Sequence, residues 1–327
     1  TSNDTALQQS VQLWDTLLSH PQFSGIPGRL QSALWNGAGG TYMRSYWRRG
    51  VRADLERAIS LFSQALQGTP PDSPDRPSLL NNLATALRSR YARDGLPQDL
   101  EEAITTYRQA LQVTPPDSPD RPSLLNNLVT AISAHYEFSR QSSNLQEYLH
   151  KVEQKNENDL DEIINLYEEL IEIQENKQEK DNQKDSQLIN FRHNLSIYKI
   201  EKGEYYEGLE LLEKCLDILR TGDDLETHAK VVYQIARAHH LLGNLDEARV
   251  SYRDAYRIFE TTKNWEGMAA CKRGLGRLMI KNGRCDLALE HLSEAEKIYQ
   301  QLGDQNKLEQ LNREIQTVRS ILEREKI

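Results

Sequence analysis

Fifteen consecutive residues of this chain occur twice without a change, 45 positions apart. The segment TPPDSPDRPSLLNNL covers residues 69–83 and again residues 114–128. Positions on either side keep the same offset, since Tyr91 corresponds to Tyr136. A fixed period of this size is typical of repeat arrays, in which copies of one supersecondary unit stack on each other. We therefore interpret the rest of the chain as further copies of that unit.

Beyond residue 188 a second period of 40 residues replaces the first. Gly203, Gly243 and Gly283 mark it, and each lies between two segments with a helical apolar stripe. A glycine between two helices is typical of a chain reversal that needs positive φ. The expected helices are 188–202, 205–220, 226–242, 245–262, 265–282 and 286–302, followed by a last helix over 305–325.

The first half follows the same plan. Residues 34–50 align without gaps on residues 79–95, which places the glycine-rich stretch Asn36–Gly40 inside a helix. A phosphate-binding loop would need a preceding strand and a following Lys-Ser/Thr, and the sequence has neither. The second helix covers 54–67, after which prolines end it and Asp75 is placed to cap the next helix.

These periods divide the chain into five parts. A leading helix and linker cover 1–25, repeats of 45 residues cover 26–142, repeats of 40 residues cover 188–303, and a capping helix covers 304–327. Residues 143–187 hold an irregular repeat with an insertion of about 15 residues, for which we expect a short extra helix and a polar loop at 145–158, and then a polar connector at 174–187.

Composition excludes several functions. The chain has a net charge of −9, and residues 1–150 contain 13 arginines and no lysine against 14 acidic residues. Neither half is basic enough for nucleic acid to be the main ligand. No apolar run reaches the roughly 18 residues that span a bilayer. Three scattered cysteines suit a reducing compartment, so we expect a cytoplasmic protein without membrane contact.

The cysteines and histidines form no catalytic or metal-binding pattern. Cys215 and Cys285 fall on apolar or turn positions, where a cysteine usually fills the core. His239 and His240 are adjacent and therefore point about 100° apart on a helix, which does not suit one metal. We predict no catalytic residue, no cofactor and no metal. Trp47 with its neighbouring arginines could stack on a nucleic acid, but packing of Trp47 is the favoured interpretation.

The residues at fixed places in each pair resemble the tetratricopeptide repeat. That family has a small residue midway along the first helix, then alanine, an aromatic or large apolar residue, and alanine along the second. The matching sets include Gly39, Ala58, Phe62 and Ala65; Ala84, Ala103, Tyr107 and Ala110; Ala236, Ala248, Tyr252 and Ala255; and Gly276, Ala288, Leu292 and Ala295. The resemblance covers about residues 26–325 and implies an all-α, right-handed α-solenoid of about six helix pairs with capping helices.

Narrower resemblances suggest two contexts. The segment PDRPSLLNNLATALRSRYARDGLPQDLEEAI is similar to repeats that precede caspase-like CHAT protease domains in bacteria and fungi. The 40-residue units resemble those of kinesin light chains and of bacterial peptide sensors. The first resemblance implies an alternative function, in which this chain is the regulatory arm of a larger protein whose effector lies outside it.

The first helix of each pair lines the concave groove in such arrays, so its polar residues are the candidate contacts. Asparagine can bond a peptide backbone, and arginine can bind a carboxylate at two points. We therefore expect a scaffold that binds a partner protein or peptide, with an acidic group or a free C-terminus, in the groove. The candidate residues are Asn82, Asn127, Asn194, Lys230, Gln234, Arg237, Arg273, Arg277 and Lys281.

An alternative interpretation of the same residues is structural. The asparagines would then bond neighbouring helices, and the basic side chains would pair with Glu226, Asp246 or Glu247.

Overall fold

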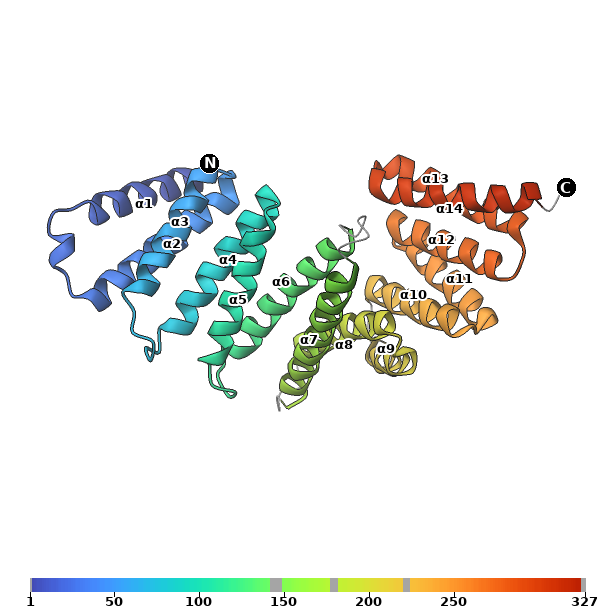
Figure 1. The fold of residues 1–327 in the computed structure, drawn as a ribbon, viewed down its shortest axis with the longest axis horizontal. Coiled ribbons are helices and arrows are strands. Elements are labelled where there is room, and N and C mark those ends of the chain that lie inside the picture. The colour runs from blue at the N-terminus through green and yellow to red at the C-terminus, as the bar shows by residue number, and fades with distance from the viewer. Residues whose placement is uncertain (1, 142–148, 177–181, 220–223, 325–327) are drawn as a thin grey trace. The chain divides into compact units, whose positions relative to one another are not determined.

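The computed structural model describes residues 2–141, 149–176, 182–219 and 224–324. These residues form fourteen α-helices and one short 3-10 helix, and no strand occurs among them (Figure 1). The chain divides into two compact bodies, Thr1–Leu166 and Tyr167–Ile327. We call them the N-terminal body and the C-terminal body.

The helices of the N-terminal body follow the repeat expected from the sequence. They are α1 (Ser2–Leu18), α2 (Gly28–Arg49), α3 (Arg52–Gln67), α4 (Arg76–Asp94), α5 (Pro97–Gln112), α6 (Arg121–Gln141) and the first part of α7 (Leu149–Asn176), with the 3-10 helix at Phe23–Gly25.

The C-terminal body continues with the end of α7 and seven more helices. They are α8 (Asn182–Lys202), α9 (Tyr205–Leu219), α10 (Leu225–Leu242), α11 (Leu245–Thr261), α12 (Trp265–Lys281), α13 (Cys285–Leu302) and α14 (Gln305–Arg324). Consecutive helices pack in pairs, from α2 with α3 to α12 with α13 (Figure 1). The prediction of about six pairs with a further helix at each end is confirmed.

Glycines in the left-handed region reverse the chain between the helices of a pair. Gly243 ends α10 with φ 87°, and Gly203 and Gly283 have φ 92° and 70°. A side chain at such a φ is strained, so these positions favour glycine. The periodic glycines of the sequence are therefore turn residues, as expected.

Small residues bring the two helices of a pair into contact. A Cβ atom on Gly276 of α12 would lie 2.7 Å from Cδ2 of Leu292 on α13. A Cβ atom on Gly39 of α2 would lie 2.6 Å from the ring of Phe62 on α3. The glycine-rich stretch of α2 thus lies inside a helix and permits close packing.

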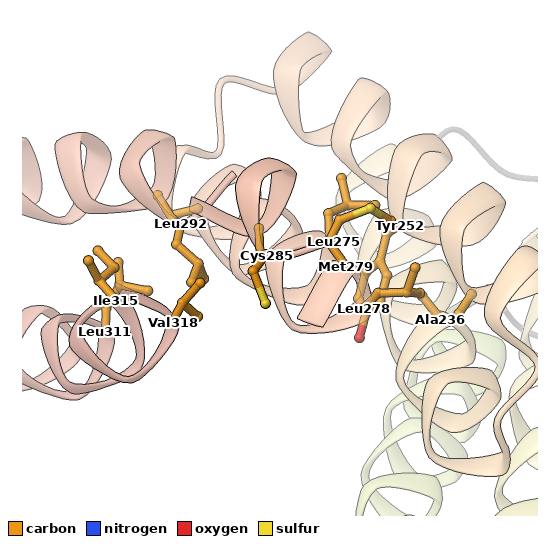
Figure 2. Packing of buried hydrophobic residues seen from close by; sticks show 14 of the residues in the cluster. Ala236, Tyr252, Leu275, Leu278, Met279, Cys285, Leu292, Leu311, Ile315 and Val318 are labelled. Carbon is orange, nitrogen blue, oxygen red and sulfur yellow. The ribbon is translucent and has the colours of Figure 1, made fainter. Parts of the chain in front are cut away.

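One apolar cluster joins the last five helices of the C-terminal body, α10 to α14. Leu292 and Cys285 from α13 lie against α12 residues and against Leu311, Ile315 and Val318 from α14 (Figure 2). All five side chains are at most 5% exposed. The terminal helix is therefore anchored by apolar burial, which is the dominant favourable term in folding.

The duplicated segment forms the turn between consecutive pairs, but its aspartate does not act as predicted. Asp75 has helical backbone angles and makes no side-chain cap. The guanidinium of Arg76 closes the turn instead, because it donates to the carbonyl of Thr69 at 2.9 Å. Arg121 repeats this bond with Thr114 at 3.2 Å. The expected carboxylate cap was wrong.

The insertion also differs from expectation. Residues 149–158 belong to the start of one continuous helix, α7, rather than to a short extra helix and a polar loop. Residues 142–148 lie outside the described residues. The polar connector is taken up largely by the ends of α7 and α8, with residues 177–181 outside the described residues.

A conserved position in the repeat frame joins the helices of each pair in the N-terminal body. A side chain in the second half of the first helix bonds a buried aspartate of the second helix, which lies in the first turn of α3 and α5 and further along in α7. The bonds are Ser45 to Asp54 at 2.6 Å, Arg90 to Asp99 at 2.6 and 2.8 Å, and His135 to Asp159 at 2.6 Å. The same kind of polar contact therefore joins the two helices of each pair, although the residue that bonds the aspartate changes from repeat to repeat.

Candidate partner-binding face

The first helices of consecutive pairs contact one another within each body. In the N-terminal body α2 contacts α4 and α4 contacts α6, and in the C-terminal body α8 contacts α10 and α10 contacts α12. Side chains on these helices therefore form a shared surface, which we call the first-helix face of each body. All nine predicted partner-binding residues belong to first helices.

Asparagines of the N-terminal body bond each other across consecutive pairs. Asn82 donates to Oδ1 of Asn36, and Asn127 donates to Oδ1 of Asn81, both at 2.9 Å. These are the bonds between neighbouring helices that the structural interpretation expected. All four side chains remain partly exposed. Since an amide has two N–H donors and two acceptor lone pairs, each asparagine keeps capacity for a further bond.

The first-helix face of the C-terminal body begins with polar residues on α8 and α10. Asn194 lies beside the side chains of His193 and Tyr167 and affects the pKa of both. Burial lowers the pKa of His193, against the effect of Asn194. Lys230 pairs with Glu226 one turn away at 3.2 Å. The expected pairing of Lys230 with Glu226 is thus present, and it occupies an exposed site.

Four basic side chains on α10 and α12 form the centre of this face. We call Arg237, Arg273, Arg277 and Lys281 the basic cluster. Arg237 donates to Oε1 of Gln234 at 2.9 Å. Gln234 is only 8% exposed. It therefore positions Arg237 and offers little surface to a partner.

Glu314 of α14 is the carboxylate partner of the basic cluster. Arg273 contacts its Oε1 at 2.5 and 3.1 Å, and Arg277 contacts its Oε2 at 3.2 Å. Lys281 donates to the carbonyl of His240 at 3.0 Å. Sequence reasoning missed Glu314, although it lies 40 residues after a position of α12 and the 40-residue period could have placed it on this face.

Charge interactions shift several pKa values in the cluster. Burial raises the pKa of Glu314, but hydrogen bonds from Arg277 and Arg273 outweigh it and leave the pKa below its ordinary value. The bond to Glu314 raises the pKa of Arg277. Burial, with Lys281 and Arg277 nearby, lowers the pKa of His240. Both members of the Arg277–Glu314 pair are therefore charged at neutral pH, while burial favours a neutral imidazole in His240.

Aromatic rings lie beside the basic cluster. The rings of Tyr233 and Tyr252 are 5.8 Å apart, and the His240 ring meets Tyr252 edge to face at 6.3 Å. Burial raises the pKa of Tyr233, with Arg237, Arg277 and Arg273 acting in the opposite direction. The cations thus lie next to an apolar ring surface, which strengthens their interaction with an anion by excluding water.

The three cysteines are all buried. Burial raises the pKa of Cys215 and of Cys271 to about 12, so neither thiol supplies a thiolate nucleophile at neutral pH. Among the described residues no cluster of histidine, cysteine or carboxylate side chains could hold a metal ion. No described helix is long and apolar enough to cross a membrane.

Trp47 does not pack as expected. Its side chain is 61% exposed, while Arg52 pairs with Asp94 at 2.9 Å and with Glu56 at 3.5 Å. The expectation that the tryptophan is buried was therefore wrong, whereas Arg52 lies at the turn with acidic partners.

Comparison with known proteins agrees with this architecture. The tetratricopeptide repeat family matches residues 78–120, 187–261 and 228–301. No curated protein matches the sequence.

Several solved structures are similar to the chain. The C-terminal part of a TPR repeat-containing protein from Cytophaga hutchinsonii has a TM-score of 0.55 at 11% identity, covering 91% of this chain and 92% of that one. The apo form of RapI has a TM-score of 0.50 at 12% identity, with 90% and 99% covered. A putative kinesin light chain from Podosopora anserina with TPR-like repeats has a TM-score of 0.48 at 20% identity, with 72% and 98% covered.

The chain therefore contains tetratricopeptide repeats, within an all-helical fold of helix pairs that pack consecutively. Its fold is typical of scaffolds for protein–protein interaction.

Proposed function

We propose that this chain is a scaffold that binds an acidic segment or a free C-terminus of a partner protein on the first-helix face of its C-terminal body. The observation that carries the proposal is the charge of the basic cluster. Among the described residues, Arg273 and Arg277 both pair with one carboxylate, Glu314, whereas Arg237 bonds an amide oxygen and Lys281 a backbone carbonyl. A second carboxylate would complete the pairing.

The geometry suits a carboxylate ligand. Arg237 is bonded to a neutral amide, and Lys281 to a neutral carbonyl, so both keep their full charge available. The side chain of Arg277 is 51% exposed and can be reached from solvent. Arginine binds a carboxylate through two parallel N–H donors, which gives direction as well as affinity. The adjacent Tyr233 offers an apolar contact for the residue that carries the carboxylate.

The first-helix face of the N-terminal body offers amide groups that would bind peptide backbone. Asn36, Asn82, Asn81 and Asn127 bond in pairs and leave further amide groups partly exposed. Amide side chains can bond the N–H and C=O groups of an extended peptide. In this proposal the asparagines hold backbone, and Asn194, Lys230 and the basic cluster select acidic groups.

The proposal is tested by fluorescence anisotropy with an array of labelled peptides. Each peptide is made with a free C-terminal carboxylate and as the C-terminal amide, with acidic or neutral residues before the end. We expect binding of free-carboxylate acidic peptides, and its loss in the double variant Arg237→Glu/Lys281→Glu. These two residues are chosen because neither pairs with Glu314.

A matched control reverses the same number of charges on α11, the second helix of the pair that contains Arg237. Arg249 and Arg257 lie on α11, where they pair with Asp246 at 2.9 Å and Asp254 at 3.5 Å. Arg249→Glu/Arg257→Glu should bind the peptides like the natural protein. Equal weakening by both double variants would mean that general charge attracts the peptides, and the site would be wrong.

The narrower predictions of context belong to the same proposal. We infer a cytoplasmic scaffold that works with a partner protein rather than with nucleic acid. A regulatory arm for a CHAT-type effector stays a prediction, and the flanking parts of the parent gene would test it directly.

A further inference from the structure

The terminal helix places an acidic side chain at the centre of the basic cluster. Arg273 and Arg277 each donate to both carboxylate oxygens of Glu314, with Arg273 2.5 Å from Oε1 and Arg277 3.2 Å from Oε2. Gln310, one turn earlier, accepts a longer contact from Arg273 at 3.4 Å. Two arginines that bond one carboxylate form the arrangement expected for a bound acidic ligand.

The repeat frame shows that this acid is particular to α14. The helix packs on α13 as the first helix of a further pair would. Its Glu314 lies 40 residues after Gly274 of α12 and 80 residues after Gln234 of α10. The equivalent positions of the two preceding pairs are thus neutral. Only the terminal helix brings a negative charge to this row of the first-helix face.

Glu314 is not what holds α14 in place. Leu311, Ile315 and Val318 of the same helix are 0%, 3% and 0% exposed and belong to the apolar cluster with α13 (Figure 2). A second ion pair, between Lys307 of α14 and Glu266 of α12, joins the same helices outside the basic cluster. The helix therefore has anchors that do not involve Glu314.

We propose that Glu314 is an internal competitor, which occupies part of the basic cluster in the free protein and lowers its affinity for the carboxylate of a partner. This inference rests on the proposed function, because the competing ligand is the acidic segment proposed above. A ligand carboxylate at Arg277 must share that guanidinium with Glu314 or replace it. The terminal helix thereby sets the affinity of the face without blocking all of it, since Arg237 and Lys281 have no bond to Glu314.

The experiment compares Glu314→Gln with the natural protein. The probe is a fluorescein-labelled peptide, Gly-Ser-Gly-Glu-Asp with a free C-terminal carboxylate, titrated by anisotropy. The variant should bind about tenfold more tightly, the factor that corresponds to removing one competing charged hydrogen bond. Circular dichroism checks that the helices are retained, as the apolar anchors of α14 predict.

Glu266→Gln is the matched control, because it makes the same substitution in the other ion pair between α12 and α14. It should leave the affinity unchanged. Unchanged or weaker binding by Glu314→Gln overturns the inference, and so does an equal gain in both variants.

Arg237→Glu/Lys281→Glu separates this result from the proposed function. If that double variant loses the peptide while Glu314→Gln binds like the natural protein, the face binds acids and only the internal competitor is wrong. If the double variant binds like the natural protein, the proposed function fails and the inference fails with it.

Discussion

The close approach of α12 and α13 gives a sharp test of the packing. Leu292 is fully buried, and its Cγ and Cδ2 atoms lie 2.7 Å from where a Cβ atom on Gly276 would stand. Leu292→Ala should therefore lower the free energy of unfolding by about 2–5 kcal/mol through lost burial and a cavity. Gly276→Ala should lower it by about 0–2 kcal/mol, because overpacking of about 1–3 kcal/mol exceeds or cancels the gain of about 1 kcal/mol in helix propensity.

The double variant Gly276→Ala/Leu292→Ala tests most sharply whether the two side chains meet. With Leu292 cut back to alanine, the two atoms 2.7 Å from the new Cβ are gone, and the carbonyl oxygen of Ala288, at 3.3 Å, is the nearest remaining neighbour. Gly276→Ala should then stabilise the protein by about 1 kcal/mol, its helix-propensity gain. The coupling energy between the two positions is expected to be about 1–3 kcal/mol.

Urea unfolding followed by circular dichroism measures each free energy. Gly39→Ala, in the other body, serves as the control because it collides with Phe62 and not with Leu292. Its effect should add to that of Leu292→Ala within about 0.5 kcal/mol. If Gly276→Ala has the same effect with and without Leu292, these side chains do not meet and the helix pairing is wrong.

Three further predictions follow from buried polar groups. Asp99→Ala should lower the free energy of unfolding by about 2–3 kcal/mol in urea, less than for a fully buried pair because Arg90 is 23% exposed; adding Arg90→Met should restore most of the loss. Cys215 and Cys271, whose pKa values burial raises to about 12, should not react with a disulfide reagent at pH 8 until urea unfolds the protein; rapid reaction in the folded state would contradict their burial. Burial and nearby cations lower the pKa of His240, so the unfolded chain takes up its proton at higher pH and stability should fall as the pH drops from about 7 to 5; His240→Gln should reduce that slope in urea titrations at each pH.

The sequence contained most of the fold because the fold is repetitive. The chain reversals could be predicted because each depends on the φ angle of one glycine, which is a local property of the chain. These glycines are Gly203, Gly243 and Gly283. The small residues at Gly39 and Gly276 likewise face a partner within the same helix pair, less than 25 residues away. Periodicity was therefore enough to place helices, turns and contacts within a pair.

Contacts between pairs were harder to predict. Asn82 meets Asn36, and Arg273 meets Glu314, across separations of 46 and 41 residues. Which groups bond there depends on how one pair is rotated on the next, and local sequence does not record that rotation. The basic residues were found because their type and face were visible, whereas Glu314 was missed because α14 was interpreted only as a cap.

Two other predictions were wrong for local reasons. Asp75 was expected to cap α4, but the neighbouring Arg76 bonds the carbonyl of Thr69 and closes the same turn. The insertion was expected to break the helix, yet α7 runs from Leu149 through the boundary of the two bodies. Charged residues such as Lys and Glu are good helix formers, so a polar stretch can lengthen a helix as readily as end it.

The central claim, that a partner segment lies on the first-helix face of the C-terminal body, is tested most directly by photo-cross-linking. The peptide Gly-Ser-Gly-Glu-Asp is made with a photoreactive residue next to its terminal carboxylate and irradiated with the natural protein, and mass spectrometry locates the linked residues. The account predicts cross-links on α10 and α12, at residues 225–242 and 265–281, and their loss in Arg237→Glu/Lys281→Glu. Cross-links confined to the second helices α11 and α13, or unchanged by that variant, would contradict it.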